Sequence, residues 1–495
     1  MTSVPSLPRS LYTADSVKTL DQLATDQGGI PSAELMERAG SGAFDVLRGQ
    51  YPASRRIVVV CGAGNNAGDG YVVARLACDE NFAVSIVQVG AIERLTGDAK
   101  TNFERLPASV RVTASPEDID IADVDVVVDA LLGTGLLRDV EGPWAHAVAW
   151  MNASAAPVLA LDVPSGLDSD TGRICGCAVH ADITTCFVGL KRGLFTGCGP
   201  SLVGALHYFD LDIGADVFSR VTQDARRVSY ADVTALLAPR PRHFHKGDCG
   251  HVLIVGGDRG FAGAARMAAE AAARAGAGLI SVATHPEHAR MLGFGRPEIM
   301  VHGVSEMAQL QALMARSDLI AIGPGLGQSS WSQHMWSLVA SSEQPCIVDA
   351  DALNLLAREP RSREDWVLTP HPGEAARLLG GSTVDVQDDR FATVRKLVGR
   401  YGGVVVLKGS GSLIADADST PLICGHGNPG MASGGMGDVL TGVIAGLVGQ
   451  GLTLPSAAAA GVCVHALAAD READQGERGM LASDLMPWIR RLVNP

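Results

Sequence analysis

The sequence predicts an α/β protein made of two domains, each built around a largely parallel sheet. Short runs of aliphatic and β-branched residues alternate with helical stretches along most of the chain. These runs are apolar throughout, which is typical of parallel strands covered by helices on both faces. The chain has 495 residues, of which 47% are hydrophobic and 19% charged. Two sizeable cores can therefore form, and a mainly disordered chain is excluded.

The first half is predicted to begin with two helices and to continue as a doubly wound sheet. The expected helices cover residues 13–25, 31–48 and 69–79. Pro31 suits the start of the second helix, because a residue in that position needs no backbone N–H partner. The expected strands cover residues 56–61, 83–89, 125–129 and 157–162.

The alternation stops near residues 214–242, where Pro239 and Pro241 interrupt it, and a second array follows. The expected strands of this array cover residues 250–255, 318–322, 346–349, 366–369 and 404–407. Its expected helices cover residues 262–275, 438–448 and 456–469. Polar residues and a proline divide the apolar stretch 439–469, which favours two buried helices over a membrane span. We expect the two domains to comprise residues 1–220 and 221–495.

The net charge is −14, from 40 Lys and Arg against 54 Asp and Glu. We therefore expect no nucleic acid and no membrane among the partners, because both favour basic surfaces. Small anions are not excluded, since glycine loops bind them through backbone N–H groups and the chain holds 58 glycines. The ten cysteines include no CxxC pair, and we expect no signal peptide at the N-terminus. Reduced thiols, a cytoplasmic location and a homo-oligomer are expected.

A glycine loop over residues 62–70 joins the first expected strand to a helix. Such a junction presents backbone N–H groups and the positive end of a helix dipole to an anion. The glycine spacing differs from the dinucleotide fingerprint, and Asn65, Asn66 and Asp69 lie inside the loop. Their side chains would add oxygen donors to the N–H groups. The plain alternative is a tight turn.

Two further strands of the first half end on acidic residues. Asp129 precedes the loop that starts at Gly133, and Asp162 precedes Ser165. Because the carboxyl ends of parallel strands share one edge of a sheet, these residues are expected to converge with Asn66. Clustered carboxylates need a cation, and an all-oxygen set favours an alkali metal, Mg²⁺ or Ca²⁺. Taken singly, each aspartate is as well explained by a loop cap.

Together these motifs resemble the NAD(P)H-hydrate epimerase domain, which has a Rossmann-like three-layer fold, over about residues 11–215. The stretches from Leu35 to Gly40 and from Lys191 to Leu194 add to the resemblance. The resemblance implies that Asp162 contacts the hydrated dinucleotide and transfers the proton. It implies that K⁺ is held by Asn66, Asp129 and Ser165.

The resemblance also implies further substrate contacts in the two loops. These are Asn65, Asn66, Ala67, Gly68, Asp69, Gly133, Thr134, Gly135, Leu136, Leu137, Arg138 and Asp139. Ala67 stands where the family usually has glycine. An alanine can be accommodated there if its φ is negative.

The motif GGMGD, residues 434–438, opens an apolar helix in the second half. Glycine N–H groups at a helix N-terminus can form an anion hole for a transferring phosphoryl group. Asp438 is unfavourable beside a phosphate, but it is suited to take the proton of an attacking hydroxyl. The alternative is an ordinary helix cap. The sequence contains no Walker A motif, which excludes a P-loop enzyme.

Other motifs follow expected strands of the second half. Lys408 ends a strand before the glycine turn 409–412, which suits a nucleotide diphosphate. The remaining motifs are GPGLG at 323–327, DADALN at 349–354 and HPGE at 371–374. Each alone is as well explained by a turn between a strand and a helix. Their positions at successive strand ends indicate one binding crevice.

These motifs resemble the ADP-dependent NAD(P)H-hydrate dehydratase, a member of the ribokinase-like fold, over about residues 228–493. The resemblance implies that Asp438 contacts the substrate as the base. It implies other substrate contacts at Ala262, Gly325 and the stretch His371–Glu374. It implies ADP contacts at Lys408, Gly409, Ser410, Gly411, Ser412 and Gly437, with ADP as the phosphoryl donor and Mg²⁺ beside it.

The two resemblances together predict a bifunctional repair enzyme for hydrated NADH and NADPH. The N-terminal domain would interconvert the R and S epimers, and the C-terminal domain would dehydrate the S epimer through a phosphorylated intermediate. The main alternative is a vitamin or sugar kinase of the ribokinase-like fold with a non-catalytic Rossmann-like binding domain. The complete set of strand-end residues in the first half argues against a silent N-terminal domain.

Overall fold

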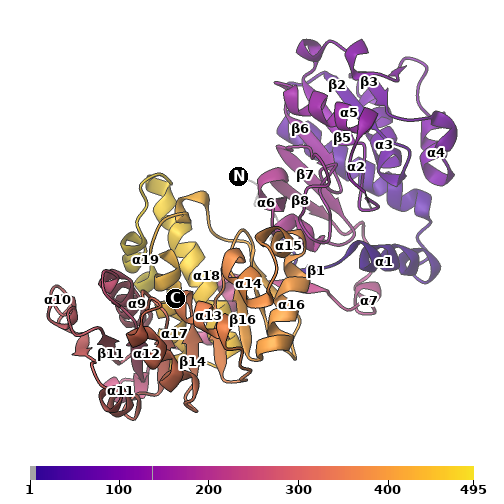
Figure 1. Cartoon of the computed structure of the whole chain (residues 1–495). Coiled ribbons are helices and arrows are strands. Elements are labelled where there is room, and N and C mark those ends of the chain that lie inside the picture. The colour runs from indigo at the N-terminus through magenta and orange to yellow at the C-terminus, as the bar shows by residue number, and fades with distance from the viewer. Residues whose placement is uncertain (1–6, 137) are drawn as a thin grey trace. The chain divides into compact units, whose positions relative to one another are not determined.

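The computed structural model describes residues 7–136 and 138–495 (Figure 1). The chain divides into two compact units, Met1–Arg226 and Arg227–Pro495, which are termed the N-terminal unit and the C-terminal unit. No helix within the described residues combines the length and the hydropathy that a bilayer crossing requires.

The N-terminal unit is a three-layer α/β domain, as the apolar strand runs predicted. Its sheet contains β2 (Arg56–Cys61), β3 (Ala83–Gln88), β4 (Arg111–Thr113), β5 (Val126–Ala130), β6 (Val158–Leu161), β7 (Ile183–Phe187) and β8 (Ala205–Phe209). The strands are parallel, in the order β4-β3-β2-β5-β6-β7-β8. A separate short strand β1 (Ser10–Leu11) pairs antiparallel with β9 (Ala225–Arg227).

Helices cover both faces of this sheet. They are α1 (Ala14–Asp26), α2 (Ser32–Gln50), α3 (Asn65–Asp79), α4 (Gly97–Glu104), α5 (Gly142–Ala153), α6 (Gly199–Leu202) and α7 (Ala215–Phe218). Alternate residues of β2 enter opposite cores, because side chains alternate across a strand. Val59 packs with residues of α2 and α3, whereas Val60 packs with residues of α5. The all-apolar sequence of the strand follows from this double burial.

The C-terminal unit is built around a second, mixed sheet. Its strands are β10 (His251–Val255), β11 (Leu279–Thr284), β12 (Met300–Gly303), β13 (Leu319–Ile322), β14 (Cys346–Val348), β15 (Trp366–Leu368), β16 (Val404–Leu407), β17 (Ser412–Ala415) and β18 (Leu422–Cys424). They follow the order β18-β17-β16-β15-β14-β13-β10-β11-β12. Strands from β16 to β12 pair in parallel, and β17 pairs antiparallel with both β16 and β18.

The helices of this unit include two glycine- and alanine-rich ones. The longer helices are α9 (Ala262–Ala275), α11 (Met307–Met314), α12 (Ser330–Ala340), α13 (Ala350–Arg358), α14 (Pro372–Leu379), α16 (Arg390–Tyr401), α17 (Met436–Gly449), α18 (Leu454–Glu472) and α19 (Leu485–Leu492). The shorter ones are α8 (Tyr230–Leu236), α10 (Ala289–Leu292) and α15 (Thr383–Asp388). The apolar stretch 439–469 thus forms parts of two buried helices, as predicted.

Small residues allow α17 to lie directly on α9. A Cβ atom on Gly442 would stand only 2.1 Å from the carbonyl oxygen of Ala268, so a larger residue would force the helices apart. The same helix α17 also packs on β10, β13 and β14. This packing places the motif at residues 434–438 next to the ends of the central strands.

The expected strands are present, with small shifts at their ends, but the helix expected over 69–79 begins earlier, at Asn65. Glycine permits the extension, because Cβ atoms on Gly68 and Gly70 would collide with Met36 and with Ala130. Tertiary packing therefore outweighs the low helix propensity of this stretch. The parallel strands β4, β7, β8, β11 and β12 and the antiparallel strands β17 and β18 were not expected.

Candidate active sites

A buried carboxylate forms the centre of the first site, at the ends of β5 and β6. Asp129 is fully buried and accepts hydrogen bonds from Ser165 Oγ at 2.6 Å and Ser165 N at 2.8 Å. Leu131 N donates a third, at 3.2 Å. Burial raises the pKa of Asp129 to about 6, although these hydrogen bonds lower it. All three donors are neutral groups, so they leave the charge of the ionised carboxylate uncompensated.

Asn66 brings an amide oxygen to the same place. Its Nδ2 donates to the carbonyl oxygen of Leu132 at 3.0 Å, and Leu132 N donates to Ser165 Oγ at 2.8 Å. The amide oxygen Oδ1 of Asn66 is buried and has no hydrogen-bond partner among the described residues. Buried polar atoms normally have a partner, so an oxygen without one near a buried carboxylate indicates a place for a positively charged ligand. The predicted ligands Asn66, Asp129 and Ser165 are therefore linked through Leu132 and supply oxygen atoms of the kind that hard cations favour.

Asp162 belongs to a neighbouring ionic cluster. Its backbone is left-handed, with φ of 64°, directly after β6. Its carboxylate pairs with the amine of Lys191, whose side chain is only 1% exposed. The same amine donates to the carbonyl oxygen of Phe187 at 2.8 Å and to Cys186 Sγ at 3.7 Å. The donors of Lys191 are thus used to orient Asp162 and to bind the last two residues of β7.

Two more carboxylates act on this pair. Burial raises the pKa of Asp69 well above its usual range, the charges of Asp162 and Asp21 add to the rise, and Lys191 opposes it. Asp21, in α1, has a pKa raised to about 6 by burial, against the effect of Lys191. Burial lowers the pKa of Lys191, but the ion pair with Asp162 and the other acidic groups around the amine together raise it by more, so the amine stays protonated. The carboxyl groups of Asp21, Asp69 and Asp162 thus all interact with the ammonium group of Lys191.

The remaining residues predicted to contact substrate lie in two segments. Asn65 is exposed at the start of α3, and Ala67 and Gly68 are buried in its first turns. Because Ala67 is helical, its φ is negative, so alanine meets no conformational cost there. In the loop after β5, Gly133, Thr134 and Leu136 are half-buried, and Gly135, Arg138 and Asp139 are exposed. Leu137 lies outside the described residues. Their contacts with substrate stay a prediction.

The second site opens at the start of α17, where Asp438 lies in the first helical turn. The pKa of Asp438 is raised to about 7, first by burial and then by the charges of Asp349, Asp351 and Glu374, against the opposing effect of Lys408. A carboxyl group of this kind exists in both protonation states near neutral pH. That property suits a group that accepts a proton from a hydroxyl.

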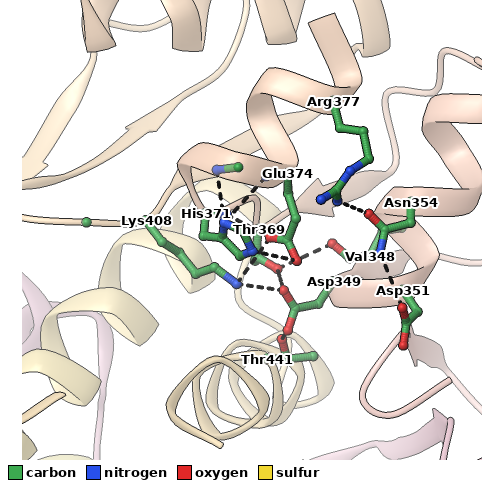
Figure 2. Close-up of polar contacts among 12 residues, drawn as sticks. Val348, Asp349, Asp351, Asn354, Thr369, His371, Glu374, Arg377, Lys408 and Thr441 are labelled. Atoms are coloured by element: carbon green, nitrogen blue, oxygen red, sulfur yellow. Dashed lines mark hydrogen bonds and ion pairs between the residues drawn. The ribbon is translucent and has the colours of Figure 1, made fainter. Parts of the chain in front are cut away.

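Asp349, after β14, is the hub of the second site (Figure 2). It is 1% exposed and accepts hydrogen bonds from Thr369 Oγ1, Lys408 Nζ and Thr441 Oγ1, each at 2.8 Å. These partners follow β15, follow β16 and lie in α17. One buried carboxylate therefore ties together the strand ends and the helix that carries Asp438.

The motif at residues 371–374 builds the start of α14. The ring of His371 accepts from Gly373 N at 3.0 Å, and the Glu374 carboxylate accepts from His371 N at 2.7 Å. The motif thus forms a capping box, which was the alternative that the sequence left open. Glu374 is also buried, with its carboxylate 3.8 Å from Lys408 Nζ, so the cap brings a further acidic group to the site.

A polar chain links the motifs of this unit. Gly327 N donates to Asp351 at 2.9 Å, Asn354 donates to Asp351 at 3.2 Å, and Arg377 donates to Asn354 (Figure 2). The glycine loop also meets the start of α9, because a Cβ on Gly325 would stand 2.4 Å from the carbonyl oxygen of Phe261. Gly325 and Ala262, both predicted to contact substrate, therefore lie close together.

The predicted nucleotide turn, residues 408–412, joins β16 to β17 as an antiparallel hairpin. Arg390, a fully buried residue of α16, supports it by donating to the carbonyl oxygens of Leu407 at 3.1 Å and Lys408 at 3.3 Å. Sequence reasoning missed Arg390, and it noted Lys191 only within the stretch Lys191–Leu194, without giving it a role. The available signal for Lys191 was a single charged residue just after a buried strand.

The folds and the two sites define a class: a two-unit α/β protein with a Rossmann-like first unit and, in the second, a cluster of buried carboxyl groups at a glycine-rich helix start. Two family models match the chain. "YjeF-related protein N-terminus" matches residues 32–193, and "NAD(P)H-hydrate dehydratase" matches residues 252–491.

Curated relatives match over nearly the full length. The bifunctional NAD(P)H-hydrate repair enzyme Nnr of Coxiella burnetii is 47% identical over 98% of this chain and 99% of its own. The enzyme of the same name from Escherichia coli is 44% identical over 99% of this chain and 95% of its own. A solved ribokinase-like superfamily protein from Enterococcus faecalis is 31% identical, with a TM-score of 0.52, over 55% of this chain and 98% of its own. The chain belongs to the family of bifunctional NAD(P)H-hydrate repair enzymes.

Proposed function

We propose that the chain repairs hydrated NADH and NADPH at two separate active sites. The C-terminal unit dehydrates the S epimer with ADP, and the N-terminal unit interconverts the R and S epimers. The observation that carries the first activity is Asp438, a largely buried carboxyl group with a pKa of about 7 at a glycine-rich helix start. The family to which the chain belongs favours this function over a vitamin or sugar kinase.

In the C-terminal unit, Asp438 takes the proton of the substrate hydroxyl. The hydroxyl oxygen bonds to the terminal phosphorus of ADP while the bond from that phosphorus to AMP breaks. Phosphate then leaves with the electrons of the carbon–oxygen bond, and loss of a proton from the adjacent ring carbon restores the double bond. Backbone N–H groups at residues 434–437 face the transferring phosphoryl group. Mg²⁺ bound with the nucleotide neutralises phosphate charge.

The substrate and nucleotide contacts of this unit are assigned by motif and position. Ala262, Gly325 and His371 contact the hydrate, and the turn from Lys408 to Ser412 with Gly437 contacts ADP. The proximity of Ala262 and Gly325 supports the first assignment. The hydrogen bonds from Arg390 to the hairpin support the second assignment, because they hold the nucleotide turn in place.

In the N-terminal unit, Asp162 exchanges a proton with the substrate at the hydroxyl-bearing carbon. Lys191 orients its carboxylate. Asn66 Oδ1, Asp129 and Ser165 hold K⁺, whose charge compensates the buried carboxylate. The unpartnered oxygen of Asn66 supports this ion site. The segment Asn65–Asp69 and the loop 133–139 contact the dinucleotide.

One experiment tests both activities on the full chain. Mixed R and S hydrates are incubated with ADP, Mg²⁺ and K⁺, and the return of nicotinamide absorbance is followed. We expect complete recovery. Recovery that stops after one epimer would remove the epimerase proposal, and recovery that does not require ADP would remove the dehydratase proposal. Phosphorylation of a vitamin or sugar instead would favour the kinase alternative.

The cellular location and the oligomeric state of the chain are also proposed. The substrates are soluble dinucleotides, and all ten cysteines are free thiols, which supports a reducing, cytoplasmic location. A homo-oligomer is proposed, and size-exclusion chromatography with light scattering tests it. We propose no nucleic-acid or membrane partner, in keeping with the net charge of −14.

A further inference from the structure

Lys408 follows a strand that leads into the nucleotide turn, yet its amine is turned toward two carboxylates (Figure 2). Its Nζ lies 2.8 Å from Asp349 Oδ1 and 3.8 Å from Glu374 Oε2. The side chain is 19% exposed. Burial lowers the pKa of Lys408, but the charges of Asp349 and Glu374 outweigh it, so the amine stays protonated. The amine is therefore clamped between two acids.

This clamp lies against the helix that carries Asp438. Asp349 Oδ2 accepts a hydrogen bond from Thr441 Oγ1 at 2.8 Å. Thr441 follows Asp438 by three positions in α17, so the two side chains share one face of the helix. A Cβ on Gly437 would stand 3.2 Å from Lys408 Nζ. The ammonium group therefore lies beneath the first turn of α17, beside the base.

We propose that Lys408, clamped by Asp349 and Glu374, is a positioning residue for Asp438. The inference rests on the proposed dehydratase function and adds a second role to the nucleotide contact that the family resemblance implies for this lysine. The ammonium favours the ionised form of Asp438, whereas Asp349 opposes it. The two charges act on the base with opposite signs.

Other titratable groups act on the same base or on the lysine. Those facing them are Asp351 in α13, His371 and Glu374 at α14, and His465 in α18. Burial and the charge of Lys408 lower the pKa of His465 to about 4 and also lower that of His371. Both rings are therefore neutral at pH 7, and the opposing charges on Asp438 come from Lys408 and from the carboxylates.

The opposite signs give a sharp test on the full chain. ADP-dependent dehydration of the S epimer is measured against pH for wild type, Lys408→Met, Asp349→Asn and the double variant. Lys408→Met should move the acid limb of kcat upward by about one pH unit and Asp349→Asn should move it downward. In the double variant the two shifts should largely cancel.

Three controls separate charge from structure. Lys408→Arg keeps the charge and should keep the acid limb of wild type. Lys396→Met removes an exposed lysine of the same unit and should change nothing. If Lys408→Met does not fold because Asp349 is left unpaired, the double variant removes both charges and carries the test.

The outcomes are distinct. A rise of about tenfold or more in KM for ADP with an unmoved acid limb would assign Lys408 to the nucleotide and overturn the inference. Shifts of the same sign in both single variants would overturn it as well. Absence of ADP-dependent dehydration in wild type would overturn the proposed function itself, and the inference with it.

Discussion

At the scale of single residues, the surroundings of Asp438 determine how readily it takes up a proton. Burial and nearby carboxylates raise its pKa to about 7. Asp438→Asn keeps the shape and removes the base. Dehydration should therefore fall by at least about 100-fold while epimerisation is unchanged, as followed by nicotinamide absorbance and by separation of the epimers. Dehydration within about tenfold of wild type would contradict the role of base.

The same residue predicts a pH dependence. The ionised carboxylate accepts the proton, so the rate of dehydration should rise with pH through about 7 and be lost below it. The measurement is kcat with saturating ADP and S hydrate across this range. Asp438→Asn should abolish the limb, and a wild-type rate that is flat from acid to neutral pH would argue against this assignment.

In the N-terminal unit, the charge of Asp162 can be removed by substitution without a change of backbone conformation. Its φ of 64° is left-handed, and asparagine tolerates that conformation well. Asp162→Asn should therefore lower the rate of epimerisation by about 100-fold or more and leave dehydration of the S epimer intact. Asp216→Asn, at an exposed position of the same unit, is the matched control. Equal loss of both activities would contradict two separate sites.

Much at this scale was visible in the sequence. Asn66, Asp129 and Ser165 were expected to converge, since each follows a strand of one parallel sheet, and the structure brings them together. The ion pair of Lys191 with Asp162 was not predicted. Its members follow neighbouring strands but lie 29 positions apart, and no spacing rule relates a buried lysine to one particular carboxylate.

At the scale of elements, the contact between α9 and α17 determines where the second site forms. Gly442→Ala would place a Cβ 2.1 Å from the carbonyl oxygen of Ala268. We expect a loss of about 1–3 kcal/mol in the free energy of unfolding, measured by denaturant titration. Gly399→Ala, in α16, meets nothing within 4 Å and is the control, with stability equal to wild type or slightly higher. Equal stability of Gly442→Ala and wild type would show that the helices can separate at little cost.

Two secondary-structure elements differ from what the local sequence patterns predicted. The strand at residues 404–407 was predicted, but the hairpin that continues it as β17 was not. Its turn is supported by Arg390, which lies 17 positions before Leu407. The helix α3 likewise starts earlier than its composition suggests, because Gly68 and Gly70 allow close packing.

At the scale of the whole molecule, two ions are proposed to serve two independent units. Replacement of K⁺ by a bulky organic cation should slow epimerisation by about tenfold or more and spare dehydration, because Asp129 and Asn66 lose their positive partner. Chelation of Mg²⁺ should have the reverse effect. The measurement is each activity alone, with the R epimer or with the S epimer and ADP. Equal sensitivity of both activities to either ion would contradict separate ion sites.

The sequence by itself determined the two α/β units and the strand-end positions of the polar motifs. Both properties are local, since an apolar run predicts a doubly covered strand and a motif directly after it must lie at the carboxyl edge of the sheet. Only the tertiary structure decided which charges face each other. Asp349 and Lys408 are 59 positions apart, and their pairing depends on β14, β15 and β16 lying side by side. In a buried setting such a pairing contributes, after burial itself, to the pKa of the neighbouring Asp438, because low dielectric strengthens each interaction.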